Sequence, residues 1–340
     1  MQEVLLAHGG PDALPPPLTP SGLLTAWEVE PLLVLGLLAA ALLYLAGVRR
    51  LAARGVAWSG WRTVLWLTGL ATIGIATSSA VGVYDTTLFS MHAVQHMLLQ
   101  MVAPVPLGMA APVTLALRAL PRRPRQWLLA VLHSPPARVL SHPLVGFGVF
   151  VVTPFVLYYS SLYEMTLRSD LLHNLNHVHF VLVGCLFYWP LLGVDPFPHR
   201  LPYLFRFLLF LGLAPMHVLL GVPIMMRTDV MAETFYLELG RDWGPSLLTD
   251  QSIGGGIMWV FADVVSLVFV AAFARQWVRH ERRETARTDR QLDRIHGDSP
   301  TTRPWWEQDA RSAVTRKARA AGTSAAGTSP ADAAPRADGR

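Results

Sequence analysis

Histidines occur in three apolar stretches of this 340-residue sequence, where an imidazole is unexpected. The first stretch holds His92 and His96, four residues apart, and the second holds His173 and His177 with the same spacing. Residues four apart lie on one face of a helix, so each pair can offer two imidazoles to one metal ion. The third stretch contains His217. This pattern predicts a metal site formed between facing helices.

Further donors lie close to these histidines in the sequence. His179 follows His177 by two residues and therefore points to another side of the helix, while Met216 precedes His217 and offers a thioether sulfur. Imidazole and thioether donors together suit Cu(I). We predict a copper site with these ligands: His92, His96, His173, His177, His179, His217 and Met216. Three polar residues are predicted to orient the ligands through hydrogen bonds: Gln100, Asn176 and Asp263.

Simpler explanations exist for each of these residues taken alone. A single histidine within a membrane is often a hydrogen-bonded core residue, and most methionines in membrane helices only pack. For Asp263, a structural hydrogen bond or a proton relay explains the residue as well as support of a ligand does. Six histidines in three helices are harder to explain by packing, because ionisable groups are costly in a bilayer. The metal site is therefore the favoured interpretation.

Membrane helices must carry these residues. Apolar residues make up 52% of the sequence and charged residues 15%, and the apolar residues form runs that match the ~30 Å hydrocarbon core of a bilayer. We predict an all-α, polytopic membrane bundle of about seven spans, at 31–48, 63–82, 87–117, 143–160, 172–193, 203–226 and 253–274. The sequence "APVP" at 103–106 is predicted to bend the third span.

Arginine distribution predicts the orientation of the bundle. The segments after spans one, three and five hold eleven arginines, whereas the opposite side holds three. Since basic loops stay cytoplasmic, the N-terminus is predicted outside and the C-terminus in the cytoplasm. All six histidines of the three stretches then fall in the outer half of the membrane. The lone Cys185 lies within a span and is predicted to be a small core residue.

Composition divides the chain into three parts. We predict an extracytoplasmic N-terminal segment at 1–30, a transmembrane domain at 31–275 and a basic, mostly disordered cytoplasmic tail at 276–340. The tail is rich in Arg, Ala, Thr, Ser and Pro and has too few aliphatic residues to form a core. The net charge of +5 suits the anionic headgroups of the lipid bilayer. No nucleic acid is predicted as a partner. Three glycines in "SIGGGIMW" (252–259) are predicted to allow close helix packing rather than to bind nucleotide.

Several segments, in order, carry a family resemblance: "MHAVQHMLLQMVAPVPLGMAAPVTLALRALP" (91–121), "SLYEMTLRSDLLHNLNHVHF" (161–180), "FYWPLLGVDP" (187–196), "PMHVLLG" (215–221) and "DQSIGGGIMW" (250–259). Together they resemble the CtaG family of seven-span cytochrome c oxidase assembly proteins, associated with oxidases of the caa type. The resemblance covers roughly residues 60–275.

This resemblance implies an assembly factor of the cell (plasma) membrane and not an enzyme. It implies delivery of copper to the catalytic copper site of the oxidase large subunit, with that subunit and an extracytoplasmic copper donor as partners. The motifs themselves name no metal, so the copper assignment also depends on the ligand chemistry described above.

Other functions remain open at the level of sequence. Opposed histidines on two helices could ligate the iron of a b-type heme. A membrane di-iron oxidase would need more clustered histidines and carboxylates than this sequence offers. A structural scaffold for oxidase assembly would need no metal at all.

Overall fold

The computed structural model describes residues 14–198 and 202–296, and all regular structure in this part of the chain is helical. The chain divides into two units, Met1–Gln276 and Trp277–Arg340. Six helical segments of the first unit are long and apolar enough to cross a membrane: Pro31–Ala52, Gly60–Tyr84, Phe89–Ala119, Asp170–Leu192, Leu204–Met226 and Leu247–Ala271. The predicted all-α membrane bundle is confirmed.

The predicted fourth span is shorter than the other six. It corresponds to α10, Pro143–Tyr158, which has 16 residues. At 1.5 Å per residue, this helix extends about 24 Å, less than the ~30 Å hydrocarbon core. The count of seven spans and the orientation of the termini therefore stay predictions.

The described residues form helices of very different lengths. The long helices are α2 (Pro31–Ala52), α3 (Gly60–Ser78), α12 (Asp170–Leu192), α13 (Tyr203–Met226) and α15 (Leu247–His296). The shorter ones are α1 (Gly22–Thr25), α4 (Ala80–Tyr84), α5 (Phe89–Met97), η1 (Leu98–Val102), α6 (Pro104–Met109), α7 (Pro112–Ala119), α8 (Arg122–Leu132), α9 (Pro135–Leu140), α11 (Leu162–Leu167) and α14 (Glu233–Leu239).

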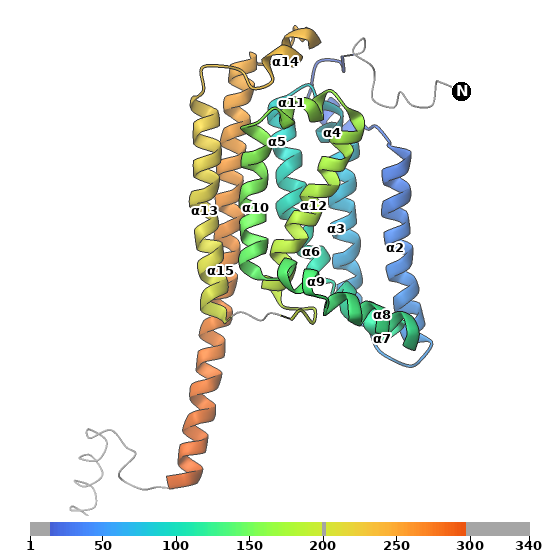
Figure 1. Cartoon of the computed structure of the whole chain (residues 1–340), viewed down its shortest axis with the longest axis vertical. Helices are drawn as coiled ribbons and strands as arrows, with labels where there is room; N and C mark the ends of the chain where they lie inside the picture. Colours follow the sequence, from blue (N-terminus) through green and yellow to red (C-terminus); the bar gives the residue numbers. More distant parts are fainter. Residues whose placement is uncertain (1–13, 199–201, 297–340) are drawn as a thin grey trace, which may run out of the picture. The chain divides into compact units, whose positions relative to one another are not determined.

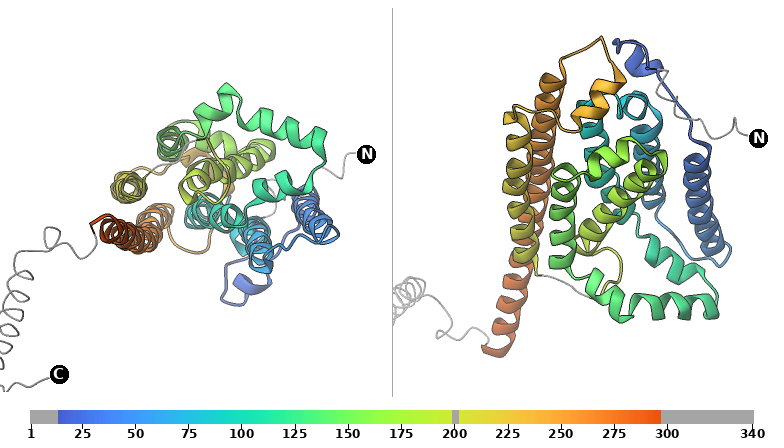
Figure 2. Two further views of the ribbon diagram at one scale, coloured as in Figure 1. Left: turned by 90° about the horizontal axis from the view of Figure 1, so that it is seen from below. Right: turned by 45° about the horizontal axis from the view of Figure 1, so that its top comes forward.

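Six of the short helices mark the two ends of the bundle. Helices α4, α11 and α14 lie at one end, which we call the α11 end, and α7, α8 and α9 lie at the other (Figures 1 and 2). Arg122 and Arg138, in α8 and α9, therefore lie at the opposite end from Arg168, which follows α11. This agrees with the alternation of the loops on which the predicted orientation depends.

The predicted third span is interrupted. Its first part, α5, continues into the π-helical turn η1, where the Ala103 amide donates to the Leu98 carbonyl at 2.9 Å, five residues back. Pro104, which cannot donate, then begins α6. The chain breaks again at Ala111, whose φ of 55° is left-handed. The bend predicted at 103–106 stays a prediction, but the wide turn directly before Pro104 shows that the regular α-helix is interrupted there.

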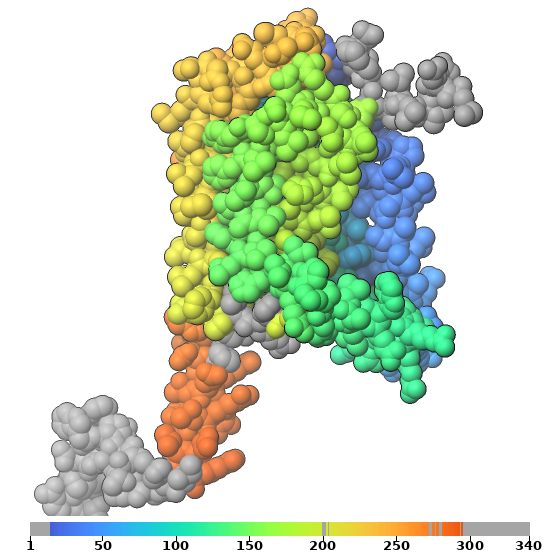
Figure 3. All heavy atoms as spheres, in the orientation of Figure 1, coloured from blue at the N-terminus to red at the C-terminus, as the bar shows by residue number. Residues whose placement is uncertain are grey.

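Helix α12 has one lipid-facing side and one buried side. Leu171, Leu175 and Leu182 are exposed, whereas His177 and Phe180 are buried. The buried residues recur every three or four positions, which is the spacing of one helix face. Figure 3 shows the outer faces of α10 and α12, in green and yellow-green, as a continuous surface. The exposed leucines suit hydrocarbon, so His173 and His177, on the opposite side of α12, face the interior.

Glycines bring α13 and α15 together. A Cβ atom at Gly255 would lie 2.7 Å from the Gly221 carbonyl oxygen, and one at Gly221 would lie 2.5 Å from the Gly255 carbonyl oxygen. Neither position therefore tolerates a side chain without a shift of the backbone. The close packing predicted for "SIGGGIMW" is confirmed. Cys185 packs partly buried against the hydrophobic core, as predicted.

The second unit is described by itself over residues 277–296. These residues are helical, whereas the sequence predicted a mostly disordered tail from 276 onward. Six of the twenty residues 277–296 are Arg, which has high helix propensity and needs no core to form a helix. The Arg290 Nε also donates to the Ala286 carbonyl at 2.8 Å. The remainder of the predicted tail, 297–340, lies outside the described residues, as do residues 1–13.

Candidate metal centre

A carboxylate and two imidazoles meet inside the α11 end of the bundle. The His173 Nε2 lies 3.0 Å and the His177 Nε2 3.7 Å from the Asp85 Oδ2. One donor atom from each residue lies within 4.8 Å of the others. The exposed fractions are 3% for Asp85, 5% for His173 and 6% for His177. We call these three residues the Asp85 group.

Helix α12 supplies the two imidazoles of the Asp85 group. Ser169 caps the helix by accepting a hydrogen bond from the Leu172 amide, which fixes the first turn. His173 and His177 follow one helical turn apart, and their ring centroids are 4.5 Å apart. The i, i+4 spacing recognised in the sequence thus produces two imidazoles side by side.

Asp85 enters the group from the short connection between α4 and α5. It caps the C-terminus of α4, whose own N-terminus is capped by Ser79. Burial alone would raise the pKa of Asp85, but His173 and His177 hold it below the usual range of a carboxyl group. The carboxylate therefore stays ionised in a buried place, and offers a negative oxygen to a cation.

Gln95 joins both parts of the Asp85 group. Its Oε1 accepts a hydrogen bond from His177 Nε2 at 2.8 Å, and its Nε2 donates to Asp85 Oδ2. The same amide nitrogen donates to the Ala76 carbonyl of α3 at 3.1 Å. Because Gln95 is itself only 1% exposed, these bonds fix the relative positions of α3, α5 and α12 around the group.

His92 lies beside the group without a hydrogen bond. It is fully buried, and neither of its ring nitrogens has a hydrogen-bond partner. Its ring centroid lies 6.0 Å from that of His173 and 5.2 Å from that of Tyr163. Leaving a buried polar atom unsatisfied costs about 1–3 kcal/mol. An imidazole kept there at such a cost is a candidate for a further ligand.

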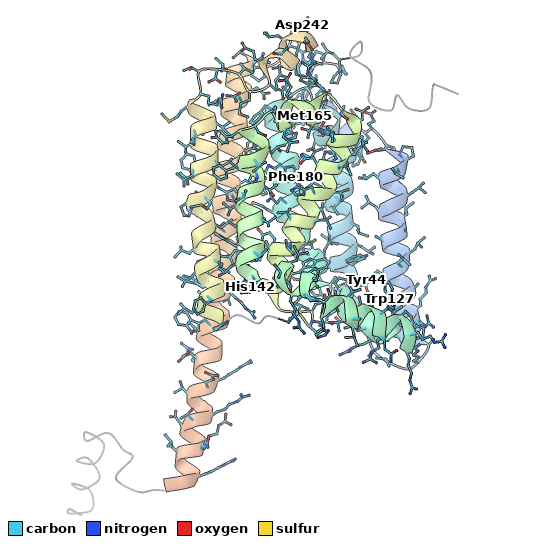
Figure 4. The ribbon with its side chains drawn as sticks, in the orientation of Figure 1. Tyr44, Trp127, His142, Met165, Phe180 and Asp242 are labelled. Carbon is cyan, nitrogen blue, oxygen red and sulfur yellow. The ribbon has the colours of Figure 1, made fainter. Side chains whose placement is uncertain are left out.

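His96 has other partners. Its Nδ1 lies 3.1 Å from the Tyr158 hydroxyl, and its Nε2 bonds the Gln100 Oε1. Its ring also stacks on Phe180 at 3.9 Å between centroids. Phe180 lies well below Met165 of α11 in Figure 4, so His96 is deeper in the bundle than the α11 end. The Gln100 amide in turn donates to the Phe150 carbonyl at 3.1 Å. The structure thus does not bring His96 into the Asp85 group.

The predicted residues of α13 and α15 are also outside the group. The His217 Nδ1 donates to the Leu213 carbonyl of its own helix at 3.1 Å. Its neighbour Met216 is half-buried. Asp263 on α15 is half-buried as well, and its Oδ1 has no hydrogen-bond partner. These residues carry polar groups within the bundle, but the structure does not assemble them with Asp85.

His179 and Asn176 face α10 instead. The His179 Nε2 lies 3.3 Å from the Thr153 hydroxyl, and the ring is exposed at the surface of the bundle. Asn176 is 9% exposed, and its amide nitrogen has no partner. Both residues line a mostly apolar groove of about 480 Å³ between α10 and α12. His179 therefore serves a second face of α12, as its angular offset from His177 predicts.

Two functional candidates were missed in the sequence. Asp85 lies in the turn between two predicted spans, on the side predicted to be outside, where the outer ends of the histidine-bearing helices also lie. Gln95 lies three residues after His92 and so belongs to the same helical stripe. An acidic residue in a short connection next to buried histidines was the available signal.

Comparison with known proteins now identifies the family. The family described as cytochrome c oxidase caa3 assembly factor matches residues 42–280. The chain belongs to this caa3 assembly-factor family. The resemblance predicted from the sequence is confirmed, and the family is one of assembly factors rather than of enzymes.

Relatives of this chain occur in mycobacteria. An uncharacterized protein of Mycobacterium bovis and one of Mycobacterium tuberculosis are each 37% identical over 292 residues, covering 84% of this chain and 44% of their own length. An uncharacterized protein of Mycobacterium leprae is 36% identical over 281 residues, covering 81% of this chain and 43% of its own length. The chain thus spans less than half the length of these relatives. No solved structure matches it.

Two acidic residues in the segments that carry the family resemblance are helix caps. Asp250 accepts hydrogen bonds from the Phe89 and Ser90 amides, at 2.7 and 3.3 Å, and so caps α5. Asp195 accepts from the Val113 and Thr114 amides, at 3.3 and 2.7 Å, and so caps α7. Both caps position the broken third span, and Asp250 in particular fixes the helix that carries His92.

Proposed function

We propose that this caa3 assembly factor binds a copper ion at the Asp85 group and passes it to the large subunit of cytochrome c oxidase. The observation that carries the proposal is the convergence of Asp85, His173 and His177 beside the unpartnered His92. Copper is here a cargo, so the site must both hold and release it. Family membership supports the role in oxidase assembly, and the donor set supports the metal.

The imidazole and carboxylate donors of the Asp85 group fit a copper ion, but they suit Cu(II) instead of the predicted Cu(I). Imidazole nitrogens with a carboxylate oxygen suit Cu(II), whereas Cu(I) favours soft sulfur donors. Met216, which motivated the prediction of Cu(I), is the neighbour of His217 on α13 and does not line the cavity at the Asp85 group. We therefore propose that Cu(II) is held by Asp85, His173 and His177, with His92 as a further ligand. Zinc is the competing ion for such a set.

Heme is disfavoured as the cargo or cofactor. The cavity that touches Asp85, His173 and His177 has a volume of about 20 Å³. A cavity needs roughly 10–15 Å³ to hold one water molecule, so this cavity can hold one water molecule or one metal ion but not a porphyrin. The separate hydrogen bonds of His96 and His217 also leave those rings directed at protein groups.

A structural scaffold without metal is the second candidate. Its supporting observation is that Asp85, Gln95 and His177 satisfy one another and connect α3, α5 and α12. A metal ion bound through the His177 Nε2 would replace its bond to Gln95. The scaffold function predicts that loss of either imidazole destabilises the bundle and leaves no separate defect in metal content.

The experiment combines metal analysis with oxidase maturation. Copper, zinc, iron and heme are measured together in the purified full-length protein, for the wild type, His177→Ala and, as a control, the exposed His133→Ala. We expect copper in the wild type and the control and its loss in His177→Ala at near-normal abundance. In cells, the His177→Ala variant should leave the oxidase short of its catalytic copper. A copper-free wild type, or a fully active oxidase with His177→Ala, would contradict the proposal.

A further inference from the structure

The cavity beside the Asp85 group opens toward two more carboxylates. Besides Asp85, His173 and His177, it is lined by Glu30, Asp170 and Asn174. Glu30 directly precedes α2 and Asp170 begins α12, and both helix ends lie at the α11 end of the bundle (Figures 1 and 2). No lysine or arginine is among the described residues that line it.

The three carboxylates differ in depth. Asp170 is exposed, Glu30 is half-buried, and Asp85 is 3% exposed. They thus form a graded series from the surface to the buried group. Carboxylates of one sign in a narrow opening attract cations and raise the rate at which cations arrive.

A cluster of acids alone does not indicate a ligand, but His173 adds an independent observation. It lines the same cavity, is 5% exposed, and its Nδ1 has no hydrogen-bond partner. Glu30 is the N-cap residue of α2, but its side chain makes no capping hydrogen bond to that helix. Its Oε1 instead accepts a hydrogen bond from the Asn174 amide at 2.7 Å, one residue after His173.

Arg168 does not neutralise this opening. It lies two residues before Asp170, but its guanidinium pairs with Glu164 and Glu238, at 2.9 and 2.7 Å. These partners lie on α11 and α14 and do not line the cavity. The carboxylates of the opening therefore keep their attraction for a cation.

We infer that Glu30 and Asp170 form an acidic mouth through which a hydrated divalent transition-metal cation, such as Cu²⁺ or Zn²⁺, reaches the Asp85 group from the α11 end. The inference rests on the proposed function and adds the route by which the ion arrives. Arrival is a ligand exchange, in which each protein donor that binds the ion displaces one water molecule and no electron is transferred. Glu30, held by Asn174, is the intermediate donor between the surface and the buried imidazoles.

The test measures the rate of metal binding. Purified full-length protein is mixed with Cu²⁺ or Zn²⁺ at low and at moderate salt, for the wild type and for Glu30→Gln combined with Asp170→Asn. We expect the double variant to bind about tenfold more slowly at low salt, with a weaker dependence on salt and an unchanged number of bound ions. The single variant Asp170→Asn changes an exposed residue, so it keeps the fold, and it should show a smaller fall in rate.

The matched control removes the same two charges elsewhere at the same end. Glu233→Gln combined with Asp242→Asn changes exposed residues of α14 and of the loop that follows it, where Figure 4 labels Asp242. Neither residue lines the cavity. If the wild type binds the ion normally and the Glu30→Gln, Asp170→Asn variant binds it as fast as this control, the acidic mouth is refuted and the proposed function is left intact. Failure of the wild type to bind either ion would overturn both.

Discussion

At the scale of single residues, Gln95 and His92 define what is distinctive about the Asp85 group. Gln95 orients two of the three donors, one through each end of its amide. His92 contributes a ring whose nitrogens are buried without partners. Gln95 therefore supports the fold and the site together, whereas His92 costs stability, which its proposed role as a ligand would explain.

Replacing Gln95 with Leu should weaken metal binding without removing it. The change deletes the acceptor for His177 and the donor to Asp85, and loss of such an orienting partner typically costs about 10–100-fold in metal affinity. Titration of the purified variant with Cu²⁺ gives the affinity and the number of ions bound. Gln100→Leu is the matched control, because Gln100 bonds His96 and not the Asp85 group. An affinity equal to that of the control would show that Gln95 does not orient the ligands.

Replacing His92 with Phe should separate function from stability. A phenyl ring fills the same buried place next to Tyr158 and Tyr163 and carries no unsatisfied nitrogen. We expect unfolding without metal to become no easier, with a gain of up to about 1–3 kcal/mol for each unsatisfied atom removed. Copper affinity should fall at the same time. Thermal unfolding with and without copper measures both, and a less stable variant with normal affinity would refute the assignment of His92 as a ligand.

At the scale of helices, backbone contact decides how α13 and α15 pack. Gly221 and Gly255 each occupy a position where a Cβ would meet the carbonyl oxygen of the other helix. In a membrane, small residues allow this approach and the close packing that stabilises a helix pair. The pair carries His217 and Asp263, so its spacing also sets the environment of those residues.

Replacing Gly255 with Ala should destabilise the bundle more than the same change one residue later. The added methyl at Gly255 would lie 2.7 Å from the Gly221 oxygen, whereas at Gly256 the nearest atom is the Met225 sulfur at 3.7 Å. Overpacking of this kind costs typically about 1–3 kcal/mol. Thermal unfolding of both variants in detergent compares them. Similar midpoints for Gly255→Ala and Gly256→Ala would mean that the two helices separate freely.

At the scale of the whole molecule, orientation in the membrane decides whether the Asp85 group can serve an oxidase. The α11 end bears the Asp85 group and the acidic mouth, and the arginine-rich α8 and α9 lie at the opposite end (Figure 1). If arginine-rich loops are cytoplasmic, the mouth opens outside the cell. An ion would then arrive from the extracytoplasmic side, and the predicted copper donor would act there.

Cysteine labelling tests this orientation. We expect a cysteine placed at position 8 to react with an impermeant reagent in intact cells, and a cysteine at position 296 to react only after the cells are opened. The native Cys185 is replaced by Ala in both variants to remove background labelling. Reaction at position 296 in intact cells would reverse the orientation and place the acidic mouth in the cytoplasm.

Local patterns in the sequence determined the helices, the interruption of the third span near Pro104, the close glycine contact and the two i, i+4 histidine pairs. These features depend on the composition of a single segment and on helical periodicity, so they can be predicted without knowing how the segments pack. The family could also be recognised, because its motifs lie within single segments. The helix over residues 277–296 differs from the predicted disorder because an arginine-rich helix forms without the hydrophobic core that the tail lacks.

Only the tertiary structure decided which side chains meet. His92 and His96 share a helix face, but they are displaced by about 6 Å along the axis, and this places His96 with Tyr158 and Gln100 instead of with Asp85. Asp85 joins the imidazoles because the connection between α4 and α5 packs against the first turns of α12. The contact between Asp85 and His173 joins residues that are 88 positions apart in the sequence. Helical spacing determines the side of a helix on which a donor lies, whereas the depth and rotation of neighbouring helices determine what it binds.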